Sequence, residues 1–267
     1  MNKIDLEHKL LKGSPIYLGD VPIYSITLGQ MVDFQYSYTM CNYIINILCI
    51  DDDKVSEMLP QEIEKTTLNM VLVQMYAELL GLENGQIPTD KIDQLLVITL
   101  PPFLKMLFRN EVNYDFNNMC FVIGSGEETR ILDKNNYDDF RNILKERNCL
   151  MDVDGVENDD NPDNDMARKL LEKRKKLREK VRKAKLRNGE DDEGLTLADL
   201  ISIFAEAEKI PLQDVYDKYD IYQFNNQFNR LKIMEDYQVN IKALLAGAKS
   251  EEVKLQHWLS KIKKQEE

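Results

Sequence analysis

The stretch LTLADLISIFAEAEKIPLQDVYDKYDIYQFNNQFNRL, residues 195–231, contains two complete helix starts. Thr196 is followed three residues later by Asp199, and Asp220 is followed by Gln223. This is the spacing of a capping box, in which the first residue caps the helix and the second returns a hydrogen bond to it. An apolar residue before each cap can also staple to one in the first turn: Leu195 to Leu200, and Tyr219 to Phe224.

The pattern of apolar residues continues to the end of the chain. A third helix is expected to begin at Asp236 and Tyr237 and to end before Gly247. Residues 195–267 are therefore predicted to form a C-terminal helical module. Its internal apolar face is expected at Phe224, Phe228 and Leu231, and a last stripe, at Leu255, Trp258, Leu259 and Ile262, can cover it.

Composition limits the classes of protein that this chain can be. The 267 residues are 43% hydrophobic, enough for a core, and the formal charge of −12 argues against a general binder of nucleic acids or membrane surfaces. The four cysteines form no C-x-x-C pair and are expected to be reduced. No signal peptide and no apolar run of roughly 18 residues is found, so a soluble protein made in the cytoplasm is expected.

Residues 1–150 are predicted to form a mostly helical domain with hairpins near 15–26 and 119–133. Thr27 and Gln30 start a helix by a capping box, and dense apolar residues across 34–50 predict a core helix or, alternatively, a helix that contacts another subunit. The acids Asp51, Asp52 and Asp53 are interpreted as a helix end and a solvated turn, because an EF-hand loop would need glycine where Ser56 stands.

The second half of this domain alternates helices with one hairpin. A helix is predicted over residues 61–80 with Gly81 as its stop, and another opens at Thr89 and is broken or offset by Pro101 and Pro102. A further helix is capped by Asn136. The fold class is thus mainly α with a small β component (α+β).

Residues 151–194 are predicted to be a charged linker that contains a basic helix over 166–187. Seven acids lie in 152–165, and twelve lysines and arginines lie in 168–187. The basic helix can be a solvated part of a tether, can dock on an acidic surface or coil with a partner, or can bind nucleic acid. Electrostatic contacts would use Arg174, Lys175, Arg178 and Arg182.

Catalytic and metal-binding patterns are missing from the sequence. His8 and His257 are the only histidines, and no cluster has the ligand spacing of a metal site. We therefore expect no enzyme activity, no catalytic residues, no metal and no cofactor.

Several short motifs together resemble proteins encoded in the tail-gene clusters of tailed bacteriophages and of prophages of low-GC bacteria. The layout of the chain also looks like that of tail assembly chaperones, although its long basic helix departs from the pattern. The motifs are GSPIYL at 13–18, IYSITLGQ at 23–30, IYQF at 221–224, FNRL at 228–231, Tyr237, LLAGA at 244–248 and Trp258.

The resemblance implies a non-enzymatic tail assembly protein. Such a protein binds tail or tape-measure subunits through apolar helix faces in the host cytoplasm. Neither nucleic acid nor membrane is expected as its partner, and association into a homo-oligomer is left as an alternative. A structural component of the virion tail, baseplate or neck is the first alternative, and a nucleic-acid-associated regulator that uses the basic helix is the second. The expected partner-binding residues are Trp258, Leu255, Tyr222 and Tyr237.

Overall fold

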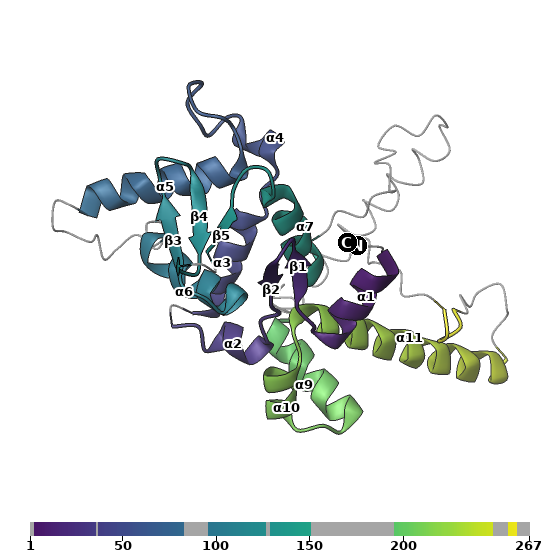
Figure 1. Cartoon of the computed structure of the whole chain (residues 1–267). Helices are drawn as coiled ribbons and strands as arrows, with labels where there is room; N and C mark the ends of the chain where they lie inside the picture. Colours follow the sequence, from purple (N-terminus) through teal and green to yellow (C-terminus); the bar gives the residue numbers. More distant parts are fainter. Residues whose placement is uncertain are drawn as a thin grey trace, which may run out of the picture. The chain divides into compact units, whose positions relative to one another are not determined.

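The computed structural model describes residues 3–35, 37–82, 96–126, 129–150, 195–247 and 256–260 (Figure 1). The fold is mainly helical with two small antiparallel sheets, which confirms the predicted fold class. Contacts along the chain group Met1–Met151 with Gln213–Ile262 in one unit, and Asp152–Leu212 with Lys263–Glu267 in another. The three-part division of the chain, at residues 150 and 195, stays a prediction. The basic helix and its acidic flanks lie outside the described residues.

The N-terminal hairpin forms where the sequence predicted it, after helix α1 (Lys3–Lys12). Strand β1 (Ile16–Leu18) pairs antiparallel with β2 (Val21–Ile23). Gly19 turns the chain between them with a φ of +62°, a left-handed conformation that glycine adopts without steric cost.

The apolar run after the hairpin forms two helices instead of one. The short α2 (Leu28–Val32) begins at the predicted capping box, where Gln30 N–H donates to Thr27 Oγ1 at 3.2 Å. A second cap, at Ser37, then starts α3 (Tyr38–Leu48). The buried side chains of α3 join the main core, so its assignment as a core helix is confirmed.

Two apolar helices follow, and both differ from the prediction at one point. Helix α5 (Thr67–Leu82) begins later than residue 61. Helix α6 (Leu96–Phe108) continues through Pro101 and Pro102, so the predicted break is wrong. Buried residues on both sides of the prolines, among them Leu100 and Phe103, fix the helix in the core although two backbone donors are missing. The predicted start at Thr89 lies outside the described residues.

The second sheet has three strands, of which the sequence predicted two. The predicted hairpin is β4 (Cys120–Ile123) with β5 (Arg130–Leu132), and β3 (Val112–Asp115) adds to the other edge of β4. Helix α7 (Tyr137–Arg147) follows. Asn136 occupies its N-cap, but the side chain bonds the preceding loop at Asp133 N and Ile131 O instead of the helix.

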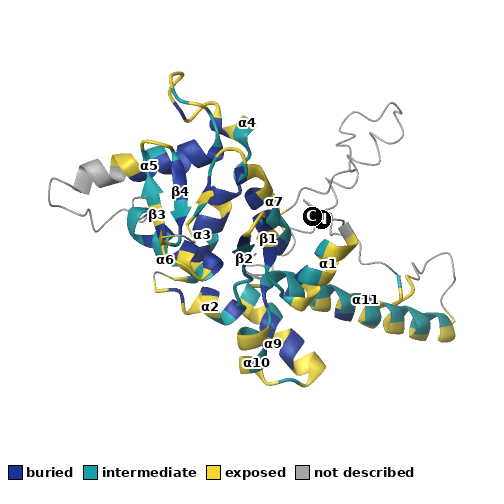
Figure 2. Ribbon diagram, in the orientation of Figure 1, coloured by how far each residue is buried: buried dark blue, intermediate teal, exposed yellow. Residues whose placement is uncertain are grey.

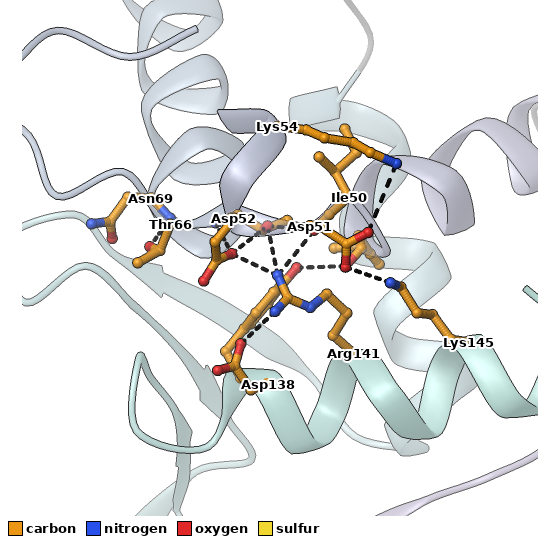
Figure 3. Close-up of polar contacts among 12 residues, drawn as sticks. Ile50, Asp51, Asp52, Lys54, Thr66, Asn69, Asp138, Arg141 and Lys145 are labelled. Atoms are coloured by element: carbon orange, nitrogen blue, oxygen red, sulfur yellow. Dashed lines mark hydrogen bonds and ion pairs between the residues drawn. The ribbon is translucent and has the colours of Figure 1, made fainter. Parts of the chain in front are cut away.

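Asp51 and Asp52 belong to a polar network and not simply to a solvated turn, which corrects the interpretation of these acids (Figure 3). Asp51 ends the loop before α4 (Asp52–Val55) and pairs with Lys145 at 2.5 Å. Asp52 accepts hydrogen bonds from Thr67 N at the start of α5 and from Arg141 of α7 at 2.6 Å. The network therefore ties three helices together through side chains.

The same contacts hold both carboxylates ionised. The hydrogen bond from Lys145 lowers the pKa of Asp51 below its ordinary value. Burial acts to raise the pKa of Asp52, but hydrogen bonds from Thr67 and Arg141 outweigh it, so this pKa is also lowered. Stability from these groups is present above the ordinary aspartate pKa and is lost as the pH falls through their lowered values.

The second unit contains α9 (Leu197–Glu208), which the sequence predicted with its cap. The capping box between Thr196 and Asp199 is confirmed. Leu195 is 66% exposed, so a staple to Leu200 would bury little of its side chain, and this contact stays a prediction.

After α10 (Leu212–Lys218), the chain forms α11 (Ile221–Leu245) as one continuous helix of 25 residues. Its capping box between Asp220 and Gln223 is confirmed. The prediction of a separate helix that begins at Asp236 is wrong, since Asp236 lies inside α11. Gly247 follows the end of the helix with a φ of +99°, as expected for a helix stop.

Candidate partner-binding surface

The first turn of α11 is fixed to the N-terminal part of the chain by backbone contacts. Leu28 N–H donates to Tyr219 O at 2.8 Å, and Thr27 and Asp220 form an isolated antiparallel bridge. Gln223 Nε2 donates to Leu11 O at 2.9 Å. Two capping boxes, at Thr27 and Asp220, therefore start helices on either side of one short pairing.

A buried pair of opposite charges lies beneath this joint. Arg147 NH1 is 3.9 Å from Asp220 Oδ2, and both side chains are 5% exposed. Arg147 NH2 also donates to Ser14 O and Ile23 O, at 2.6 and 3.2 Å. Burial raises the pKa of Asp220 despite hydrogen bonding to Gln223 N–H, and burial lowers the pKa of Arg147 to about 10.

The raised pKa of Asp220 gives a testable pH dependence. The folded state binds a proton at Asp220 more readily than the unfolded chain does. This proton therefore stabilises the folded state below about pH 3.9, and the stabilisation is lost as the pH rises through the raised pKa of Asp220. Asp220→Asn keeps a good cap but cannot ionise. Relative to the wild type, the variant should therefore gain stability as the pH rises from about 4 to about 7, measured by urea unfolding. A difference that stays constant or falls would contradict this.

The first half of α11 carries an apolar face that packs inward. This first face consists of Phe224, Phe228 and Leu231, as the sequence predicted. Phe224 and Leu231 are buried, and the rings of Phe224 and Phe228 stack at 5.7 Å. Helix α11 packs against α1 and α7, so this half belongs to the body of its unit.

The second half of α11 carries a different apolar face, and it contains no buried residue (Figure 2). At roughly 100° per residue, this second face is turned by about 130° from the first. Its residues alternate in steps of three and four, the spacing by which one helix packs along another. The residues of the second face, all half-buried, are Met234, Tyr237, Ile241 and Leu244.

The C-terminal turn, residues 256–260, lies against the beginning of the second face. Arg230, one step before Met234 in the same series, donates from NH1 to Trp258 O at 2.8 Å and to Ser260 O at 2.7 Å. The rings of Tyr237 and His257 meet edge to face with their centroids 5.1 Å apart, and the rings of His257 and Trp258 stack with centroids 6.0 Å apart. These residues form a turn, so the described part of the predicted last stripe is not helical.

The structure brings two of the predicted partner-binding residues close together. Tyr237 and Trp258 both contact His257, and Trp258 is 42% exposed. Tyr222 lies instead at the joint in the first turn of α11, where burial raises its pKa to about 12. The other predicted contacts, Leu255 and the basic residues Arg174, Lys175, Arg178 and Arg182, lie outside the described residues.

Sequence reasoning missed the second face as a unit, and it also missed Arg230. The three-and-four spacing from residue 230 to 244 could have shown both. The expectation of a new helix at Asp236 divided this series between two elements.

One cleft in the structure is lined by no residue of α11. A cleft of about 450 Å³ is lined largely by polar residues, and its lining contains no hydroxyl, thiol or imidazole group. Within the described ranges, no group of three histidine, cysteine or acidic side chains is placed to hold a metal ion. The lining residues are Glu62, Ile63, Glu64, Asn69, Val73, Asn118, Met119, Asp133, Lys134 and Asn135.

Every helix in the described part of the chain is too short or too polar to cross a membrane.

Comparison with known proteins finds a similarity that covers the candidate surface. Residues 187–263 match the family model of the YomV second domain. YomV is a protein of the Bacillus prophage SPβ, so the match suggests a phage origin. No curated protein and no solved structure matches the chain. The matched range contains all of α11 and the C-terminal turn.

Proposed function

We propose that this chain is a non-enzymatic phage protein that binds a tail or tape-measure subunit during tail assembly in the host cytoplasm. The observation that carries the proposal is the second face of α11. It is apolar, regularly spaced and turned away from the face that packs inward, and none of its residues is buried.

An amphipathic helix with this spacing is a common means of holding another helix or an apolar groove. The strongly negative chain, with a formal charge of −12, opposes association with copies of itself. The tail assignment is supported by the resemblance of the short motifs to tail-cluster proteins, and the phage origin by the matched domain.

The proposal is tested by placing a photo-cross-linking amino acid at Ile241, in the second face. Position 239 is the matched control, because Val239 lies on the same half of α11, roughly 160° around the helix, and is 62% exposed. In cells that assemble the phage, Ile241 should cross-link to a tail or tape-measure protein and Val239 should not. Equal yields at both positions, or cross-links only to unrelated host proteins, would contradict the proposal.

Mass spectrometry of purified particles separates an assembly factor from a virion component. An assembly factor should be present in the lysate and missing from finished particles. Recovery in particles at the level of known tail proteins would favour the structural alternative.

A further inference from the structure

Among the described residues, one side chain of α11 donates two hydrogen bonds to the C-terminal turn. The guanidinium of Arg230 donates to two backbone carbonyls of the turn, those of Trp258 and Ser260. Carbonyl groups that accept from a charged donor form stronger hydrogen bonds than neutral pairs do. Arg230 therefore positions the turn on the helix without depending on the turn's own side chains.

The turn is also braced by hydrogen bonds among its own residues. Ser260 N–H donates to His257 O at 2.9 Å, and Leu259 N–H donates to His257 Nδ1 at 3.2 Å. Gln256 Nε2 donates to Ser260 Oγ at 2.8 Å. The ring of His257 in the turn contacts the ring of Tyr237, which is a residue of the second face.

The turn covers this face only in part. Leu259 is 69% exposed and Trp258 is 42% exposed, so the turn buries little apolar surface of its own. Ile241 and Leu244 lie one and two steps beyond Tyr237, toward the end of α11. Ile241 and Leu244 are half-buried, and Leu245, the last residue of α11, is 83% exposed, so the end of the helix is accessible to a partner.

We propose that the C-terminal turn is a built-in cover of the partner-binding face of α11, which a partner helix must displace to bind along the whole face. This inference rests on the proposed function for the identity of the partner. A partner can first contact the open end at Ile241 and Leu244 and then replace the turn at Tyr237. Because only the uncovered state binds fully, the apparent affinity equals the intrinsic affinity multiplied by the fraction of chains that are open.

Trp258 is the only tryptophan of the chain, so its fluorescence reports on the turn without labelling. The test variant is Arg230→Met, which keeps a long side chain and removes the donors. Lys232→Met is the matched control, because Lys232 is exposed two residues further along the same helix. Far-UV circular dichroism checks that both variants keep their helices.

Acrylamide quenching of Trp258 should rise by roughly twofold in Arg230→Met, toward the value of the urea-unfolded chain, and should stay unchanged in Lys232→Met. Quenching that is as strong in the wild type as in the unfolded chain would overturn the cover. So would a value unaffected by Arg230→Met.

The effect of the turn on partner binding is measured with the cross-linker at Ile241, as the yield of the tail protein that it captures. In the Arg230→Met background the yield should increase, because the competing turn is released. An unchanged or lower yield, together with increased quenching, would overturn the competition between turn and partner. If Ile241 captures no tail protein while Trp258 responds as expected, the cover stands and the proposed function fails.

Discussion

Phe224→Ala is expected to lower the free energy of unfolding by about 3–5 kcal/mol, the typical cost of removing a fully buried phenylalanine. Phe224 is completely buried and stacks on Phe228 where α11 packs against α1 and α7. Truncation leaves a cavity at this contact that rigid neighbours cannot fill. Urea unfolding followed by circular dichroism measures the loss.

Phe228→Ala is the matched control for this prediction. Phe228 is only half-buried, so its truncation should cost about 1–2 kcal/mol, since less apolar surface leaves water on folding. The sequence predicted Phe224, Phe228 and Leu231 together on this internal face, and the structure buries Phe224 and Leu231 more deeply than Phe228. Equal losses for the two variants would contradict the burial seen here.

Arg141→Met is expected to cost about 1–3 kcal/mol, the usual cost of leaving partly buried hydrogen-bond acceptors without their donor. Arg141 donates to the carboxylates of Asp52 and Asp138 and to the carbonyl of Ile50. The methionine fills similar space but leaves these acceptors without their shared donor. Thermal or urea unfolding of the full chain measures the change.

Lys134→Met tests whether the loss depends on burial and not on charge alone. Lys134 pairs with Glu64 at 3.2 Å, but both side chains are more than half exposed. Such surface pairs contribute roughly 0–1 kcal/mol, so this variant should unfold almost as the wild type does. A comparable loss in both variants would show that the Arg141 network has no special role.

Local signals in the sequence were reliable where the interaction itself is local. The three capping boxes, at Thr27, Thr196 and Asp220, each join residues three apart, and all three form. The two predicted hairpins also close over a few residues. In each case the physical cause and the sequence pattern occupy the same short stretch.

Features that depend on distant residues could not be predicted in this way. The acids at 51 and 52 were interpreted as solvated because Arg141 and Lys145, which pair with them, lie about ninety residues later. Pro101 and Pro102 stay helical because the surrounding core fixes α6. Leu195 is exposed although its position suits a staple, which shows that a local pattern does not fix how deeply a side chain is buried.

The candidate site was predicted only in part for the same reason. Tyr237 and Trp258 were chosen as residue types common in interfaces, and the structure brings both onto His257. The function of the second face depends on α11 being continuous across Asp236. Sequence alone suggested a helix start there, because a single acid before an aromatic residue resembles a cap.

Because α11 is one continuous helix, a tilt at its first turn displaces its far end. The helix is about 37 Å long at ~1.5 Å per residue, and it is clamped at one end by the joint around Asp220. A tilt of about 10° at that clamp would carry Leu245 through about 6 Å, roughly one helical turn. Any tilt of the helix about that clamp is therefore multiplied at Leu245, its last residue.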